Sequence, residues 1–420
     1  MKKLILSLLA FGSLLTNAQE TEKKITVKTY GFIGFDAFVD SRASLNVRGS
    51  GLIYPLGPEM DDNGNDINNR SKFDFTASIT RIGFAIKGPD AFGAATSAKI
   101  EADFAGTSGN NRDFAVRLRQ AFFNLDWGKS SLLAGQTWHP MFIPENFPAT
   151  VNFVVGVPFH PLSRAPQLRY TVKPADNFSI ALFALSQGDF INKGIMEQVE
   201  MSDFPELTAQ LKYGSTKDFW IGATLGIKQV QPTPLNDNMV VTKNKLTSMH
   251  GNLSLRYTTS AVTFKAEGVY GGNMTNMVMI GGLARKTRNG NPVNAEYEAI
   301  RTSSIWTDIH TNGKNVQFGV FAAISNNHGT EGESVIYKAD TDPSTPGYEI
   351  DESIYTLGGN IEKLYIISPR ITFTSGPLKL GLEINRTVAS YGSGYNEKSK
   401  PINTKDYGNT RLVLGFRYYF

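Results

Sequence analysis

The stretch Asn409–Phe420 reads Asn-Thr-Arg-Leu-Val-Leu-Gly-Phe-Arg-Tyr-Tyr-Phe. Successive side chains of an extended strand point to opposite faces, so every second residue shares a face. One face is wholly apolar and contains Leu412, Leu414, Phe416, Tyr418 and Phe420. Such a strand suits a sheet that closes on itself in lipid, where every backbone polar group must be paired within the protein. The stretch therefore predicts an all-β protein, a transmembrane antiparallel β-barrel of a bacterial outer membrane.

The N-terminal residues have the pattern of an export signal. Lys2 and Lys3 precede the apolar run Leu4–Leu15, and small or polar residues follow it. This run is short for a membrane-spanning helix, but a basic start, an apolar centre and a small residue before the cleavage point are typical of a secretory signal. We predict that residues 1–18 are a cleaved signal peptide and that residues 19–420 form one transmembrane β-barrel domain. A membrane-anchoring helix is the alternative.

The composition excludes several classes of protein. There are no cysteines, which excludes disulfides and thiolate metal sites. No apolar stretch of about 18 residues follows the signal, so a helical membrane protein is excluded. The formal net charge of +4 falls to +2 when Lys2 and Lys3 are removed, which gives no reason to expect a nucleic-acid partner. The five histidines are scattered along the chain without ligand spacing, so we expect no metal site and no cofactor.

Alternation of polar and apolar residues divides the chain into sixteen expected strands. They cover residues 25–39, 72–87, 95–106, 113–127, 130–138, 165–173, 177–185, 206–213, 219–229, 247–259, 262–271, 296–311, 315–326, 362–374, 378–389 and 409–420. The segments at 296–311 and 362–374 alternate poorly, and Pro369 would remove a ladder hydrogen bond, so fourteen and eighteen strands are alternatives. Connections after even-numbered strands are short and most of the others are long. This pattern is typical of outer-membrane barrels, and it places both ends of the barrel on the periplasmic side.

Aromatic residues gather beside the short connections. They include Trp127, Phe178, Tyr213, Phe219, Trp220, Tyr257 and Phe373. Outer-membrane barrels carry aromatic girdles where the lipid meets water. We therefore expect these side chains to form an interfacial belt at the short-turn rim.

The direction of each charged face follows from the cost of placing charge in lipid. In the segment 95–106, Lys99, Glu101 and Asp103 alternate with apolar residues. A lysine facing the middle of the bilayer costs about 2–4 kcal/mol, so this charged face must line the lumen. The same argument turns many basic residues inward, and it nominates these as pore-lining: Arg81, Lys99, Arg117, Arg119, Arg169, Arg256, Arg411 and Arg417. Rows of basic side chains along a pore attract anions.

The acids on the same wall give a second interpretation of this charge. If the strand containing Asp103 pairs with the strand containing Arg117, then Glu101 and Asp103 approach Arg117 and Arg119. Cross-strand pairs of opposite charge are common in sheets. This hairpin is therefore either part of an arginine-lined path or a neutralised wall.

The connection from His139 to Arg164 is the most unusual loop. It contains five prolines and many large apolar residues, and Glu145 is its single acid. A segment this apolar would form an exposed hydrophobic patch on a surface loop, so it should fold into the barrel or pack at a subunit interface. As the connection between the fifth and sixth strands, it lies where general porins carry their constriction loop. Glu145, Asn146 and Asn152 would be its polar contributions, and Glu145 facing the arginines would create a transverse field.

Four short stretches carry a family resemblance. They are Arg117-Leu-Arg-Gln-Ala-Phe-Phe, Leu133-Ala-Gly-Gln-Thr-Trp138, Pro148-Ala-Thr-Val-Asn152 and Arg164-Ala-Pro-Gln-Leu-Arg-Tyr170. Together they resemble the DcaP-type porins, a family of trimeric outer-membrane diffusion channels, and more loosely the phosphate-selective and general porins. The resemblance implies passage of small, often negatively charged solutes such as carboxylates. It places Arg117, Arg119, Arg164 and Arg169 at the matching basic positions.

The functional hypothesis is a passive porin of the outer membrane that is not an enzyme. We expect a homotrimer that contacts membrane lipid and lipopolysaccharide and passes small anionic or polar solutes. The alternative is an outer-membrane barrel with a closed lumen, either an enzyme of the lipase or protease type or an adhesin.

Overall fold

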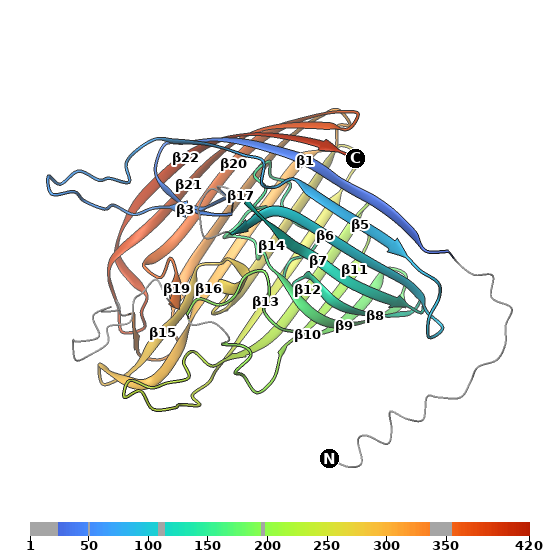
Figure 1. Ribbon diagram of the computed structural model, residues 1–420. Helices are drawn as coiled ribbons and strands as arrows, with labels where there is room; N and C mark the ends of the chain where they lie inside the picture. The colour runs from blue at the N-terminus through green and yellow to red at the C-terminus, as the bar shows by residue number, and fades with distance from the viewer. Residues whose placement is uncertain (1–23, 49–50, 108–113, 195–197, 337–354) are drawn as a thin grey trace, which may run out of the picture.

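The computed structural model describes residues 24–48, 51–107, 114–194, 198–336 and 355–420. They form a closed antiparallel barrel whose strands run obliquely around a single lumen (Figure 1). The segment predicted to be a signal peptide lies outside the described residues. Among the described residues, no helix is long and apolar enough to cross a membrane.

The barrel wall contains sixteen strands when β4 and β5, which both pair with β1, are counted as one interrupted strand. The strands are β1 (Thr26–Asp40), β4 (Lys72–Thr76) with β5 (Arg81–Lys87), β6 (Ala95–Thr107), β7 (Phe114–Asp126), β8 (Ser130–Trp138), β9 (Arg164–Ala175), β10 (Phe178–Leu185), β11 (Glu206–Gly214), β12 (Phe219–Val230), β13 (Leu246–Thr258), β14 (Val262–Gly272), β16 (Asn291–Thr311), β17 (Val316–Gly329), β20 (Ile361–Ser375), β21 (Leu378–Tyr395) and β22 (Pro401–Tyr419). Each corresponds to one expected strand, so sixteen is confirmed over fourteen and eighteen.

Pro369 is accommodated by a local break in the ladder. Pairing between β20 and β21 stops at Ile367 and resumes at Arg370. Proline has no backbone N–H, so the missing pairing at Pro369 leaves no unsatisfied hydrogen-bond donor on that residue. The weak alternation of the segment therefore reflects an interrupted strand and not a missing one.

Additional short strands lie among the long loops. β2 (Ser44–Val47) and β3 (Gly51–Pro55) form a separate two-stranded sheet, while β15 (Gly281–Arg288), β18 (Ser334–Val335) and β19 (Thr356–Leu357) extend the wall beyond β16. Thr275–Met277 form a 3-10 turn between β14 and β15. All these segments lie in connections between the sixteen expected strands.

The final strand closes the barrel as expected. β22 pairs with β1 from Phe32↔Tyr419 to Asp40↔Arg411, and the backbones of Gly31 and Phe420 exchange two hydrogen bonds of 3.2 Å. Along β22, Leu412 is 42% exposed on the outside whereas Val413 is fully buried. The short connections and the C-terminus lie at the same end of the barrel, opposite the long loops (Figure 1).

The aromatic side chains beside the short connections face outward, with one exception. Trp127, Tyr213, Tyr257 and Phe373 are each at least 40% exposed. Trp220 is 4% exposed and lies inside the barrel, so its assignment to the interfacial belt was wrong. It follows the outward Phe219 directly in β12, and the alternation of a strand turns neighbouring side chains to opposite faces.

The connection between β8 and β9 folds into the lumen, which confirms the expected inserted loop. We call residues 139–163 the constriction loop. Its side chains Val154 and Phe159 pack with Ile53 of β3 and with Trp306 and Phe321 of the wall in one buried apolar cluster. A second inserted segment, the β2–β3 hairpin, therefore packs on the constriction loop inside the barrel.

Candidate pore constriction

Cross-strand ion pairs line the lumen side of β6 and β7. Asp103 Oδ2 lies 2.6 Å from Arg117 Nη2 and 2.8 Å from Arg119 Nη1, and Glu101 Oε1 lies 2.7 Å from Arg119 Nε. The antiparallel register pairs Asp103 with Arg117 directly, which is why these side chains meet. Both acids of this hairpin are therefore held by arginines.

A further carboxylate enters this group from a long loop. Asp189, in the connection between β10 and β11, forms ion pairs with Arg48, Arg117 and Arg164, and its Oδ1 lies 3.2 Å from Arg117 Nη1. Burial alone would raise the pKa of Asp189, but the guanidinium groups of Arg164, Arg117 and Arg48 hold it below its ordinary value. We call six basic residues the basic cluster: Arg48, Arg81, Lys99, Arg117, Arg119 and Arg164. The acids paired with them are Glu101, Asp103 and Asp189.

Two wall residues at the edge of the basic cluster are less tightly paired. Arg81 Nε lies 3.8 Å and Lys99 Nζ 3.6 Å from Glu101, longer than the pairs made by Arg117 and Arg119. The Nε atoms of Arg81 and Arg164 are buried without a hydrogen-bond partner. The cluster therefore contains donor groups that its own acids do not use.

The basic cluster borders a cavity of about 310 Å³. All six basic residues line it, together with apolar side chains of the constriction loop: Phe142, Pro144, Phe147, Phe153, Val154, Val155 and Leu162. Trp138 also lines the cavity, and the Arg164 guanidinium stacks over its ring at 4.8 Å from the centroid. The space thus has a charged face on the wall and an apolar face on the loop.

The polar residues of the constriction loop bind the opposite part of the wall. Glu145 Oε1 lies 2.8 Å from Lys212 Nζ on β11, and its backbone carbonyl accepts a 3.0 Å hydrogen bond from Arg256 Nη1 on β13. Neither Glu145 nor Arg256 lines the basic cavity. Glu145 therefore lies beside Lys212 and Arg256 and away from the cavity that Arg117 and Arg119 border, and the transverse field stays a prediction.

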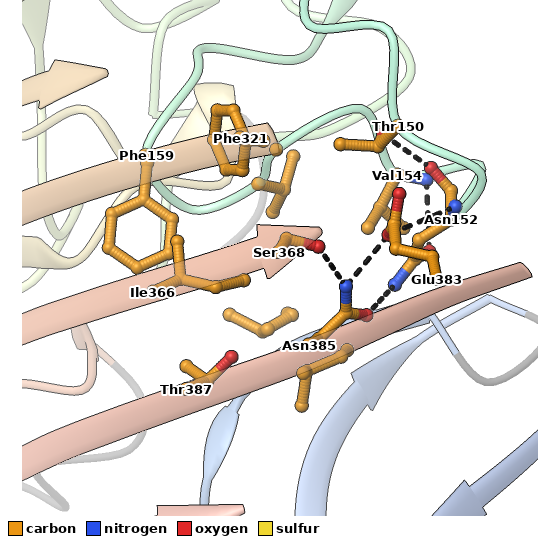
Figure 2. Close-up of a pocket in the computed structure, with 14 residues that line it drawn as sticks. Thr150, Asn152, Val154, Phe159, Phe321, Ile366, Ser368, Glu383, Asn385 and Thr387 are labelled. Atoms are coloured by element: carbon orange, nitrogen blue, oxygen red, sulfur yellow. Dashed lines mark hydrogen bonds between the residues drawn. The ribbon is translucent and has the colours of Figure 1, made fainter. Parts of the chain in front are cut away.

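The tip of the constriction loop is attached to β21, as Figure 2 shows. Glu383 of β21 accepts backbone hydrogen bonds from Val151 at 2.6 Å and from Asn152 at 3.4 Å. The Asn152 side chain points toward Asn385, which also donates to Glu383 at 2.7 Å. Asn152 lines only a water-sized space of about 20 Å³ there, so it anchors the loop and does not face the basic cluster.

The other nominated arginines lie elsewhere. Arg169 donates to Gln167 Oε1 at 2.9 Å and stacks over Phe183. Arg411 lies 2.7 Å from Asp40, and Arg417 lies 2.7 Å from Asp36. None of these three borders the basic cavity. Alternation placed Arg411 and Arg417 away from lipid, but their acidic partners on β1 bind them to the wall.

The structure also brings together histidines that are far apart in the sequence. His139 Nε2 lies 2.7 Å and His250 Nε2 lies 3.1 Å from Glu206 Oε1, in a fully buried group. The backbone N–H of Met141 donates to His139 Nδ1 at 3.2 Å, so the proton of a neutral His139 ring lies on Nε2 and is donated to Glu206. That nitrogen then has no lone pair for a metal ion, and the group serves to fix the start of the constriction loop.

Sequence reasoning missed Arg48 and Asp189. Both lie in long connections, where no strand alternation indicates direction, and they are 141 residues apart in the chain. The signal that could have suggested Arg48 is a basic residue shortly before the apolar run Leu52–Tyr54. For Asp189 the sequence has no comparable signal.

A closed sixteen-stranded barrel with a loop folded into its lumen between the fifth and sixth strands is the architecture of a porin-type channel. The model of the DcaP outer membrane protein family matches residues 14–239, more than half of the chain. The chain belongs to this family of outer-membrane channels and is a protein of the bacterial outer membrane.

Solved structures show the same fold. The outer membrane channel DcaP of Acinetobacter baumannii is 17% identical, with a TM-score of 0.67, and the match covers 94% of this chain and 97% of that one. OmpT of Vibrio cholerae is 10% identical with a TM-score of 0.54, covering 96% and 99% of the two chains. An anion-selective porin from Comamonas acidovorans is 10% identical with a TM-score of 0.54, covering 94% and 100%. No curated protein matches the chain.

Proposed function

We propose that this chain is a passive diffusion channel for small hydrophilic solutes that prefers anions such as carboxylates. The observation that carries the proposal is the charge of the basic cluster. Six basic side chains border the cavity and three acids contact them, which leaves a formal excess of three positive charges (six minus three). Basic side chains gathered at a narrow part of a pore raise the local concentration of anions.

The chemistry of the basic cluster also suits carboxylates. A guanidinium group presents several N–H donors in one plane, which matches the two oxygens of a carboxylate. Arg81 and Lys99 are the most exposed basic side chains of the cluster, at 28% and 30%, and they lie 3.8 Å and 3.6 Å from Glu101. A passing carboxylate could accept hydrogen bonds that the wall acids leave unused, while the apolar face of the constriction loop contacts the rest of the solute.

The assembly is proposed to be a homotrimer in contact with membrane lipid and lipopolysaccharide. Support comes from an apolar aromatic surface on β1, β4 and β22, where the ring of Phe35 lies 5.7 Å from that of Phe75 and 6.0 Å from that of Phe416. Such a surface fits either lipid or a neighbouring subunit. The proposal includes removal of residues 1–18 as a signal peptide.

The first experiment is a planar-bilayer recording of the purified protein. Stepwise, ohmic conductance is expected, with a reversal potential of anion-selective sign in a KCl gradient. A cation-selective sign would overturn the anion preference but not the channel. If conductance is absent and the protein instead hydrolyses lipid or binds a surface ligand, the closed-lumen alternative of an enzyme or adhesin is correct.

A further inference from the structure

Asp189 is bound in the way that an anionic solute would be bound. Guanidinium groups of Arg48, Arg117 and Arg164 all contact its carboxylate, and the Asp189 side chain is 1% exposed. The three arginines come from three separate parts of the chain: Arg48 directly follows β2, Arg117 lies near the start of β7, and Arg164 is the first residue of β9. Convergence of distant basic residues on one carboxylate is the arrangement of an anion-binding site.

The backbone around Asp189 fixes this position. Arg48 Nη2 also donates to the backbone carbonyl of Asp189 at 2.6 Å, and the Asp189 N–H donates to the backbone carbonyl of Arg164 at 2.9 Å. Phe190, the next residue, lies under the Arg48 guanidinium at 4.2 Å from its ring centroid and borders the cavity. The carboxylate is therefore held beside the space through which the solute would pass.

Asp189 differs from the other acids of the basic cluster in its origin. Glu101 and Asp103 belong to β6 and make cross-strand pairs that are part of the wall. Asp189 belongs to a loop, and Arg117 already has Asp103 at 2.6 Å as a closer partner. The ion pairs of β6 with β7 would remain if the charge of Asp189 were removed.

We propose that Asp189 is an internal competitor for anionic solutes, a specificity-determining residue that weakens their binding by occupying Arg48, Arg117 and Arg164. This inference rests on the proposed anion preference, and it identifies Asp189 as the residue that limits how tightly anions bind. A limit of this kind helps a diffusion channel, because a solute that binds too tightly leaves slowly and blocks the pore.

The test compares Asp189→Asn with a matched loss of charge from the same loop. Asparagine keeps the size of the side chain and removes its charge, so the excess of the cluster rises from three to four. The control is Asp203→Asn, because the Asp203 side chain is 66% exposed and pairs with Lys245 away from the cavity. Each channel is recorded in a KCl gradient and then titrated with succinate as a blocking anion.

For Asp189→Asn we expect a shift of the reversal potential toward anions and about a tenfold fall in the succinate concentration that halves the current, equivalent to about 1.4 kcal/mol. Asp203→Asn should behave as the wild type. If Asp189→Asn is less heat-stable but blocked at the same concentration, Asp189 is only a structural ion-pair partner and the inference is overturned.

A second variant keeps the inference falsifiable if Asp189→Asn does not assemble. In Arg48→Gln, Arg117 and Arg164 still hold Asp189, but the anion site loses one of its three guanidinium groups, so succinate block should weaken. Unchanged block would overturn the inference. The proposed function and this inference fail on different results. A wild-type channel without anion preference contradicts the proposed function. A shift toward anions in Asp189→Asn would still support a competing role for this carboxylate.

Discussion

Two parts of the wall face the constriction loop, and they use inward-pointing charge differently. On β6 and β7, acids and arginines bind one another side chain to side chain and leave a cavity in front of them. On β11–β14 and β21, charged side chains bind the loop itself: Lys265 donates to the carbonyl of Phe147 at 2.9 Å, and Glu383 accepts from the N–H of Val151 at 2.6 Å.

The difference shows that strand alternation decides the direction of a side chain but not its role. Arg119 and Arg256 both point inward, as expected. Arg119 borders the cavity because the constriction loop stands away from β7, whereas Arg256 is occupied by a loop carbonyl. We propose that a basic residue of this barrel acts on solutes where it borders the cavity, as Arg119 does, and not where it binds the constriction loop, as Arg256 does.

The largest effect is expected from removing positive charge from the wall strand β7, where the arginines border the cavity. Replacing Arg117 and Arg119 together by glutamine lowers the excess of the basic cluster from three to one and leaves Asp103 and Glu101 with few partners. We expect at least about a tenfold loss of anion preference, approaching cation selectivity, because uncompensated acids then line the cavity. The measurement is the reversal potential in a KCl gradient.

The matched control is the double variant Arg256→Gln and Lys265→Gln, which removes two positive charges from β13 and β14. Their donors bind carbonyls of the constriction loop, so this variant should change selectivity much less than the first. Equal shifts in the two variants would show that the two sides do not differ. Because breaking a buried ion pair costs about 3–5 kcal/mol, assembly of both variants is checked by their heat-dependent mobility on gels.

A smaller effect is expected from the anchor of the loop tip. Glu383→Gln keeps an acceptor oxygen but removes the charge that receives the N–H groups of Val151 and Asn152. Charge-assisted hydrogen bonds contribute about 1.5–3 kcal/mol, so we expect a lower thermal midpoint and noisier single-channel currents with little change of selectivity. Glu362→Gln on β20, from a partly exposed pair with Lys400 at 3.3 Å, is the control. Identical current noise in the two variants would contradict the anchoring role of Glu383.

The wall could be predicted from sequence because a two-residue period and the cost of charge in lipid are local rules. They gave all sixteen strands, the lumen face of Arg117 and Arg119, and, through the apolar composition of residues 139–163, the inserted loop. Pro369 was a misleading signal, because an interrupted ladder can tolerate a proline.

The filling of the barrel could not be predicted in the same way. The pairing of Arg48 with Asp189, and of Glu145 with Lys212, joins residues 141 and 67 positions apart through irregular loops. Loop direction depends on packing within the lumen and has no sequence period. The β2–β3 hairpin was missed for this reason, and so was the third acid of the basic cluster.

The smallest effect is expected from Lys212→Gln. Lys212 and Glu145 are 22% and 34% exposed in their side chains, and a pair of that kind contributes about 0–1 kcal/mol. Glu145 would still be held through its carbonyl by Arg256, and the loop tip by Glu383, so the loop should keep its place. The reversal potential should match that of Lys217→Gln, which removes the same charge from an exposed turn between β11 and β12. A shift as large as that of the Arg117 and Arg119 double variant would mean that solutes pass along the Glu145 side, and the roles of the two walls would be reversed.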